Sequence, residues 1–407
     1  MKRLLALVFA VLLILSGCMG GSDNGGEAAS VSESDSTAKF DIYPDNNPFT
    51  VVGRFDRAQY KALNDLQKSI YIKLDNALYN MQEGFVPLGE CEQHDVELAY
   101  YALRNDRPEY FWIPNEYSLR SNGNGFDFRF VEKDSDWVCS EKQRAELERE
   151  VKVELAEFLK TVGDEDTEYQ LELAAHDRIC DRVTYDNAAL VNPENNAHAW
   201  SIVGGIAEGK AVCEGYSRAF QVMMYMMGID CSLVTGVMSQ SHMWNTVKID
   251  GDWYHVDTTS DDTESGFYHF FFNVTDEYIQ KGRTVDKKAT NASDSDISSG
   301  KFNLFLPNCT ATKQNYHVVN SLYIGSADQV ESTVVSVICD AVRSGRSFAE
   351  FAVSPKMGFV FGEGDVAKTF NLERCISAVN AELSADQRIK SYSYGGITGA
   401  LGFTVGW

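Results

Sequence analysis

The segment from residue 210 to residue 258 constrains this chain most, because it places a cysteine, a histidine and an aspartate on three successive regular elements. Cys213 opens an amphipathic stretch that runs to residue 227 and stops before a glycine, which predicts a helix. His242 and Asp257 lie in two strand-like stretches joined by Asp-Gly, a strong signal for a tight β-hairpin. Such an order can build an activated thiol nucleophile.

The hairpin register predicts that His242 and Asp257 project from the same face of the sheet. With Asp250 and Gly251 as the two turn residues, Asp257 becomes a diagonal neighbour of His242, within about 8 Å at Cβ. A carboxylate there would orient the imidazole and support its charge when the ring takes the thiol proton. His255 has the opposite parity and is expected to be structural, although a β-bulge would invert both assignments.

The patterns around this segment predict an α+β protein with a smaller C-terminal α/β sandwich. Apolar spacing predicts helices at 57–81, 96–104, 140–161 and 167–181, and alternation predicts a hairpin at 117–131. An aromatic run at 268–274 predicts a further strand. Past residue 300 the pattern predicts strands at 317–324, 348–353, 388–394 and 398–405, with helices at 327–343 and 365–383.

The first residues resemble an export signal. Lys2 and Arg3 precede an apolar run over 4–15 that is too short to span a bilayer. It ends in Leu-Ser-Gly-Cys, which is typical of a bacterial lipobox with Cys18 as the lipidated residue. The alternative is an ordinary cleaved signal with an incidental cysteine. We therefore expect a protein outside the cytoplasm, tied by lipid to the bacterial cell membrane.

Composition shifts divide the rest of the chain. A Gly-, Ser- and acid-rich stretch to residue 39 cannot bury apolar surface and predicts a flexible tether. A polar stretch at 283–300 predicts a linker. The expected organisation is a signal peptide at 1–17, a lipid-anchored tether at 18–39, a cysteine domain with an N-terminal helical extension at 40–282, a linker at 283–300 and an α/β domain at 301–407.

Charge and cysteine content narrow the partners and cofactors. The net charge of −23 argues against nucleic acid and against anionic lipid headgroups as partners. Of the nine cysteines, setting aside Cys18 and Cys213 leaves seven, an odd number whose disulfide pairing cannot be deduced from sequence. No CxxC pairs mark a structural zinc site, and the acidic run at 257–264 lacks calcium-loop spacing and predicts a solvated loop. We expect no metal and no cofactor.

Four motifs together resemble the transglutaminase-like superfamily in its bacterial secreted lipoprotein form. They are "LRNDRPEYFWIP", "HDRICDRVTYD", "KAVCEGYSRAF" and "SHMWNTVKIDGDWYHVDTT", and the resemblance spans roughly residues 96–278. It implies a papain-related fold with Cys213 as nucleophile, His242 as general base and Asp257 as orienting acid. It also implies a thioester formed on an amide and passed to water or an amine. The chain departs from the family where a tryptophan usually follows the aspartate block, since Thr258 stands there.

The same segment offers donors for the oxyanion that an attacked carbonyl develops. The backbone N–H of Cys213 is one. Trp200 or His198 could supply a side-chain donor, although ordinary packing is the favoured explanation for each residue.

The expected function is that of a surface-anchored thiol enzyme that acts on peptide or protein amides through Cys213, His242 and Asp257. Hydrolysis is favoured over cross-linking because nothing marks a lysine-binding subsite. The alternatives are amine transfer of the transglutaminase type, or a binding or scaffold lipoprotein that keeps the fold without turnover. The expected partners are a peptide or protein substrate and, through the N-terminal lipid alone, the membrane.

Overall fold

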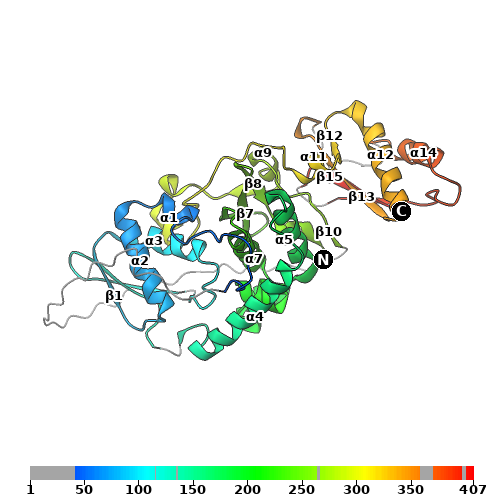
Figure 1. Ribbon diagram of the computed structural model, residues 1–407. Coiled ribbons are helices and arrows are strands. Elements are labelled where there is room, and N and C mark those ends of the chain that lie inside the picture. The colour runs from blue at the N-terminus through cyan, green and yellow to red at the C-terminus, as the bar shows by residue number, and fades with distance from the viewer. Residues whose placement is uncertain (1–41, 115, 134–135, 264–265, 358–369, 397–399) are drawn as a thin grey trace.

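The computed structural model describes residues 42–114, 116–133, 136–263, 266–357, 370–396 and 400–407. Cys18, the predicted signal peptide and the predicted tether lie outside the described residues. The chain builds a larger N-terminal part and a smaller C-terminal unit with a hydrophobic core of its own. Figure 1 shows that unit, with α12 and α14, at the opposite end of the molecule from α2 and β1. Within the described ranges, no helix is long and apolar enough to cross a membrane.

The N-terminal part begins with helices packed on a small sheet. One long helix is predicted at 57–81, but Asn64 breaks it, because its side chain caps the N–H of Gln67 and Gln67 returns the bond. The elements are α1 (Ala58–Ala62), α2 (Asp65–Tyr79), α3 (Gln93–Asp106), β1 (Val86–Glu90), β2 (Ser118–Ser121) and β3 (Gly125–Arg129), in the strand order β1-β3-β2. The predicted hairpin is therefore confirmed, and β1 completes its sheet.

Two helices then lead to the central sheet. The helices α4 (Glu141–Leu159) and α5 (Glu168–Arg182) each start at a capping box, formed by Ser140 with Gln143 and by Thr167 with Gln170. Short elements follow: β4 (Thr184–Tyr185), α6 (Asn187–Val191), η3 (Pro193–Asn195), the π-helix η4 (Val203–Glu208) and β5 (Lys210–Ala211). Strands β4 and β5 pair in parallel just ahead of Cys213.

The central layer is a helix on an antiparallel sheet, which confirms the predicted fold class. Helix α7 (Cys213–Met226) packs on β6 (Cys231–Val237) and β7 (Ser241–Ile249), and β8 (Asp252–Val256) and β11 (Thr284–Val285) complete the sheet in the order β11-β6-β7-β8. Asp250 and Gly251 form the hairpin turn at positive φ, 50° and 87°. The facing pairs run from Ile249 with Asp252 to Asn245 with Val256, which is the predicted register.

Two sequence predictions fail beyond this sheet. The aromatic run at 268–274 is not a strand: Phe270, Phe271 and Phe272 are all buried, without the alternation of a strand, and Asn273 has a positive φ of 54°. The segment 283–300 is polar in composition yet structured, since β11 pairs with β6 and Ile297 is fully buried. The elements in this region are α8 (Thr258–Asp261), β9 (Asp262–Thr263), β10 (Gly266–Phe267), α9 (Asp276–Ile279), η5 (Ala289–Asn291) and α10 (Asp294–Ser298).

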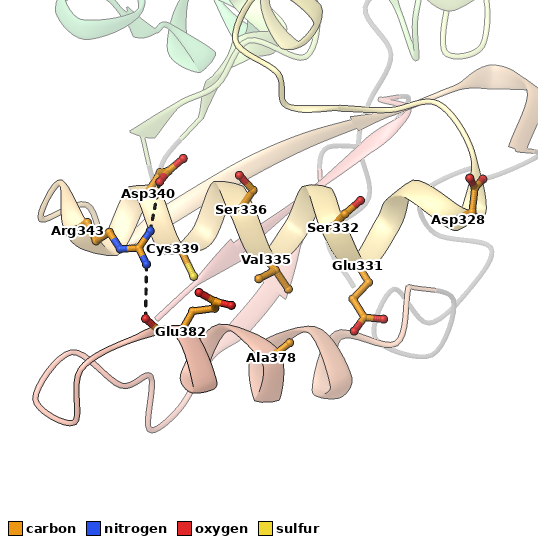
Figure 2. A pocket seen from close by; sticks show the side chains of 10 residues that line it. All are labelled: Asp328, Glu331, Ser332, Val335, Ser336, Cys339, Asp340, Arg343, Ala378 and Glu382. Atoms are coloured by element: carbon orange, nitrogen blue, oxygen red, sulfur yellow. Dashed lines mark hydrogen bonds and ion pairs between the residues drawn. The ribbon is translucent and has the colours of Figure 1, made fainter.

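The C-terminal unit is a four-stranded sheet covered by helices, as the sequence predicts. Its elements are α11 (Tyr316–Val319), β12 (Tyr323–Ile324), η6 (Ala327–Gln329), α12 (Val330–Arg343), β13 (Phe348–Val353), η7 (Pro355–Met357), α14 (Leu372–Glu382), β14 (Ser393–Gly395) and β15 (Gly402–Gly406). The sheet order is β12-β13-β15-β14. The strand predicted at 317–324 begins instead as helix α11. A groove of about 610 Å³ lies between α12 and α14, and its lining includes Val335, Arg343 and Glu382 but none of the three motif residues. Figure 2 shows the side chains that line it.

The backbone of helix α7 lies unusually close to the neighbouring segment at residues 199–211. A Cβ at Gly215 would meet the carbonyl oxygen of Ala199 and come within 2.7 Å of the Ala211 Cβ. A Cβ at Gly205 would lie 2.5 Å from the Gly215 carbonyl oxygen. Glycine at these two places therefore lets the backbones touch and fixes where the first turn of α7 stands.

Gly215→Ala is expected to destabilise the protein by about 1–3 kcal/mol through overpacking. The direction of this stability change tests the explanation, because alanine in a helix interior normally stabilises a protein relative to glycine. Urea unfolding measures the change. Gly163→Ala is the control, since a Cβ there meets nothing within 4 Å. Equal unfolding midpoints for the two variants would contradict the close-packing explanation.

Candidate active site

Cys213 stands at the first residue of α7 with its thiol partly open to solvent. Every other cysteine that the structure describes is buried, and all of the described cysteines are free thiols. The preceding residue, Val212, is held by a hydrogen bond of 2.9 Å from its N–H to the Ala199 carbonyl. The positive end of the helix dipole favours an anion at this position. Cys213 is thus the one described thiol that is both accessible and next to a helix N-terminus.

His242 bridges the thiol and a buried carboxylate. Its Nε2 lies 2.8 Å from Asp257 Oδ2, and the Cys213 side chain adjoins the ring. Because Nε2 faces the aspartate, Nδ1 is the nitrogen left for the thiol. The structure therefore brings Cys213, His242 and Asp257 together in that order, and it confirms the contact that the hairpin parity predicts.

Asp257 is completely buried and holds several donors at once. Its Oδ2 accepts from His242, from the Ser260 hydroxyl at 2.9 Å and from Arg283 Nε and Nη2 at 2.9 and 2.5 Å. Its Oδ1 accepts from the Ser260 N–H, which makes Asp257 the N-cap of α8. Burial opposes the charge, but His242 and Arg283 outweigh it and hold the pKa of Asp257 well below its usual range. The carboxylate is therefore ionised at neutral pH.

The same pair sets the charge of His242. Burial disfavours the imidazolium, yet the Asp257 carboxylate and the hydrogen bonds to Asp257 and Cys213 raise the pKa of His242 to about 10. The ring is thus cationic at neutral pH before substrate arrives. A cation beside a thiol stabilises the thiolate form.

Ser217 and Asn245 fix the helix against the strand that carries His242. The Ser217 hydroxyl lies 2.8 Å from the Cys213 carbonyl and 3.0 Å from the Met243 carbonyl. Asn245 Nδ2 donates to the Ser217 carbonyl at 3.1 Å. These bonds set the spacing between the thiol on α7 and the imidazole on β7.

Tyr185 is a site residue that the sequence predictions missed. Its side chain adjoins Cys213, and burial followed by the nearby Cys213 raises its pKa above the usual value. Of the two residues considered as oxyanion donors, His198 bonds Glu208 at 2.6 Å, and Trp200 packs around Ala199 and Val212. The "VTYD" motif contains Tyr185, but only the β4–β5 pairing carries it to the thiol.

Arg283 is the second missed residue. It falls in the segment predicted as a linker, yet its side chain is fully buried against Asp257 and its guanidinium lies 4.0 Å from the Phe271 ring centroid. It also donates to the Ser260 hydroxyl at 2.6 Å. No local pattern identifies it, because the contact with Asp257 joins positions 26 residues apart.

His255 has the structural role that its parity predicts. Trp244 Nε1 donates to its Nδ1 at 3.0 Å, and its Nε2 lies 2.9 Å from Asp276 Oδ1. Cys309 adjoins this pair and completes a group of atoms that could hold a metal ion. A neutral ring with its proton on Nε2 satisfies both contacts, so this group needs no cation.

The acidic run after Asp257 is not a solvated loop, which corrects the sequence prediction. Asp261 is fully buried, accepts from the Phe271 N–H at 3.1 Å and lies 3.2 Å from His176 Nε2. Asp262 accepts from the Tyr216 hydroxyl at 2.5 Å. The pattern of charges along the sequence could not show this burial, because His176 and Tyr216 lie on helices that are distant in the sequence.

Comparisons with known proteins agree with this geometry. Residues 156–258 match the sequence profile of the transglutaminase-like superfamily, a range that includes Cys213, His242 and Asp257. Kyphoscoliosis peptidase of Homo sapiens is 30% identical over 112 residues, which cover 23% of this chain and 17% of that protein. The chain thus matches less than a fifth of that relative's length.

Two solved structures are also similar over part of the chain. One is a candidate cysteine protease from Cytophaga hutchinsonii, 19% identical, covering 34% of this chain and 41% of that one with a TM-score of 0.24. The other is a TGase, 18% identical, covering 37% and 45% of the two chains with a TM-score of 0.26. Both TM-scores are low, so the similarity to the transglutaminase-like superfamily rests on the profile match and on the helix-on-sheet arrangement.

Arg283→Met is expected to lower the free energy of unfolding by about 3–5 kcal/mol at pH 7, because it leaves a buried carboxylate without its guanidinium. The folded-state pKa of Asp257 is depressed, so its stabilisation is complete above the ordinary aspartate pKa of about 3.9 and declines as pH falls below it. The gap between variant and wild type should therefore shrink toward pH 3. Urea unfolding from pH 7 to 3 measures it.

Lys160→Met is the control for this experiment, because it removes an ion pair with Glu157 whose side chains are 64% and 51% exposed. Exposed pairs contribute about 0–1 kcal/mol. A pH-independent loss in Arg283→Met would show that the arginine acts only through packing.

Proposed function

Because residues 156–258 belong to the transglutaminase-like superfamily, we propose that the protein is a cysteine-dependent enzyme acting on peptide or protein amides. Cys213 is the nucleophile, His242 the general acid and base, and Asp257 the residue that orients His242. The observation that carries the proposal is the series from the Cys213 thiol through the adjoining His242 ring to the buried Asp257, whose Oδ2 lies 2.8 Å from His242 Nε2. It supports acyl transfer in particular, because a thiolate and an imidazolium are the two groups that step needs.

The first step forms a thioester. The Cys213 thiolate attacks the amide carbonyl carbon, and the C=O electron pair moves onto oxygen. The Cys213 N–H and the Tyr185 hydroxyl stand where they can donate to that oxygen. When the C–N bond breaks, the His242 imidazolium protonates the departing amine. Neutral His242 then takes a proton from water or an incoming amine, which attacks the thioester and releases the thiol.

Arg283 helps His242 to release its proton and to take one up again. When the ring has given its proton away, Asp257 would be left as a buried anion beside a neutral group. The guanidinium 2.5 Å from Asp257 Oδ2 keeps that carboxylate paired throughout. It also limits how strongly Asp257 holds the proton on His242, so the imidazolium can serve as an acid. Arg283 is therefore a positioning residue for the charge of the site.

Hydrolysis is the favoured outcome for the thioester. No described feature beside Cys213 marks a subsite for a lysine amine, and water needs no such subsite. The similar human protein is named a peptidase, which is consistent with water as acceptor. Amine transfer remains the second candidate, because the same thioester serves both reactions.

We further propose that the enzyme lies on the outer side of a bacterial cell membrane. It rests on the cationic start, the short apolar run and the lipobox at Cys18, which all lie in the first 41 residues of the sequence. The acidic net charge of −23 supports a peptide or protein substrate over nucleic acid.

Cys213→Ser is expected to lower kcat/KM on any amide that the wild type processes by at least about 1,000-fold, since the hydroxyl is a far weaker nucleophile. Turnover is measured by mass spectrometry on a peptide library, with and without a primary amine. Cys91→Ser, a change at a buried thiol outside the site, should leave kcat/KM unchanged. Free acid products support hydrolysis, and amine adducts support transfer.

Equal turnover by Cys213→Ser and wild type would refute the nucleophile. A scaffold protein without turnover would in addition show Cys213 alkylated by iodoacetamide no faster than glutathione near pH 7.

Tyr185→Phe tests the proposed oxyanion donor. Loss of the hydroxyl should lower kcat by about 10²-fold with KM little changed, because the donor acts on charge that develops only in the transition state. Steady-state kinetics measure both constants. A fall in kcat matched by a rise in KM would assign Tyr185 to substrate binding, and an unchanged kcat would remove it from the site.

A further inference from the structure

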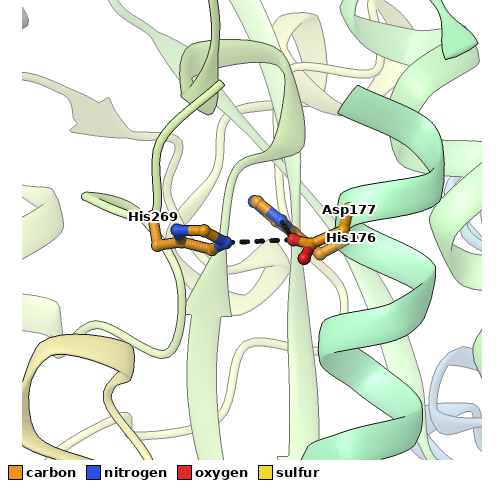
Figure 3. A group of neighbouring side chains, drawn as sticks. All are labelled: His176, Asp177 and His269. Carbon is orange, nitrogen blue, oxygen red and sulfur yellow. Dashed lines mark hydrogen bonds and ion pairs between the residues drawn. The ribbon is translucent and has the colours of Figure 1, made fainter. Parts of the chain in front are cut away.

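A second group of chemically active side chains lies outside the triad, at the junction with the C-terminal unit. His176 and Asp177 come from α5, and His269 comes from the loop after β10; Figure 3 shows the three side chains pointing toward one another. Asp177 Oδ1 lies 3.0 Å from His176 Nδ1 and 3.0 Å from His269 Nε2. All three candidate ligand atoms lie within 4.8 Å of one another.

Each imidazole in this group also has a carboxylate on its other nitrogen. His176 Nε2 lies 3.2 Å from Asp261 Oδ2, and His269 Nδ1 lies 2.8 Å from Glu350 Oε1. Both of these carboxylates are buried. A carboxylate behind a histidine is the usual outer-shell arrangement of a metal site, where it orients the ring and raises its basicity.

The number of N–H protons that each ring needs distinguishes the His176 group from the group around His255. A neutral imidazole has one N–H, and His255 needs only one, because Trp244 donates to its other nitrogen. His176 and His269 each face carboxylate oxygens on both nitrogens, so a neutral ring would set a lone pair against an anion. A cation shared by the two rings and Asp177 removes that repulsion.

We propose that His176 Nδ1, His269 Nε2 and Asp177 Oδ1 bind a zinc ion, with Asp261 and Glu350 as outer-shell partners. Two nitrogens and one carboxylate oxygen suit zinc, whereas calcium and magnesium prefer oxygen ligands alone. Tetrahedral ligands about 2.0–2.1 Å from zinc are roughly 3.3 Å apart, which is close to the two 3.0 Å separations here. Binding requires Asp177 and the two rings to open around the ion, from an arrangement in which the three ligand atoms already lie within 4.8 Å of one another.

The site has room for a fourth ligand and a route for the ion. The Asp177 side chain is 39% exposed, so water can reach the side of the carboxylate that the histidines leave open. A cavity of about 610 Å³ adjoins His269 and Glu350 and is bordered by residues of both the larger part and the C-terminal unit. Charge balance also holds, since one divalent ion supplies the same charge as protonating both rings.

Zinc here would couple four elements of the protein. Its ligands lie on α5 and the 268–274 loop, and its outer-shell carboxylates lie on α8 and on β13 of the C-terminal unit. Asp261 is the last residue of α8, and Asp257 caps the start of that same helix. The ion would therefore hold the C-terminal unit on the larger part and stiffen the turn that carries Asp257.

The experiment measures zinc bound to the full chain carrying Cys213→Ala, which removes the triad thiol as a competing ligand. Equilibrium dialysis with elemental analysis gives the stoichiometry, and competition with a chromophoric chelator gives the affinity. We expect about one zinc per chain. Asp177→Asn and His269→Gln should each weaken binding at least about 100-fold, and Glu350→Gln about 10–100-fold. Asp276→Asn, in the His255 group, is the matched control and should bind as tightly as its parent.

Cobalt(II) substitution keeps the test decisive if a ligand variant fails to fold. A cobalt spectrum without a thiolate charge-transfer band agrees with nitrogen and oxygen ligands. A thiolate band would overturn the proposal by placing the ion at Cys309 or at Cys180, whose Sγ lies 3.8 Å from His176 Nε2. It is also overturned if the folded chain takes up no zinc at micromolar concentration, the outcome in which protons alone balance the carboxylates. The proposal would also be overturned if Asp276→Asn lost zinc binding while the variants of Asp177, His269 and Glu350 kept it. None of these measurements depends on enzymatic activity.

Discussion

The buried carboxylate of Asp257 is the constraint around which the site is organised. A charge with no solvent exposure must be fully paired, and Asp257 meets this requirement with His242, Ser260 and Arg283. Each partner has a structural consequence. His242 is fixed in orientation, the chain turns into α8, and the segment with Arg283 is held against the sheet. A single electrostatic requirement thus orders three separate pieces of backbone.

The hydrogen bonds extend from this carboxylate in two directions. Toward the thiol, His242 reaches Cys213, whose helix is held at short range by Gly215 and bonded to β7 through Ser217. The other direction follows the four residues of α8 to Asp261 and the His176 group. The site is therefore rigid because helix, sheet and turn are bonded to the same few atoms, and none of them needs to reorganise when His242 exchanges its proton.

The C-terminal unit has its own apolar core, and both apolar and polar contacts attach it to the rest of the protein: Leu401 shares a buried cluster with Phe270 and Phe271. Glu350 on β13 accepts from the His269 backbone N–H through Oε2 and from the His269 ring through Oε1, and Oε2 also lies 3.3 Å from His317 Nε2. Burial disfavours the charge of Glu350, but the two histidines keep its pKa well below the usual range. Such directional, charged contacts fix an orientation that an apolar face alone would leave free to slide.

The sequence by itself predicted Cys213, His242 and Asp257 as the candidate site, because two local signals mark these residues. A cysteine begins a helix, and a two-residue turn fixes which strand residues share a face. Only the tertiary structure decided the roles of Tyr185, Arg283 and the His176–His269 group. Their contacts join residues 26 to 92 positions apart, and they form because packing buries charges that must then find partners. Composition marks polar segments as exposed, so it misplaced Arg283 and Asp261, which are buried because they are paired.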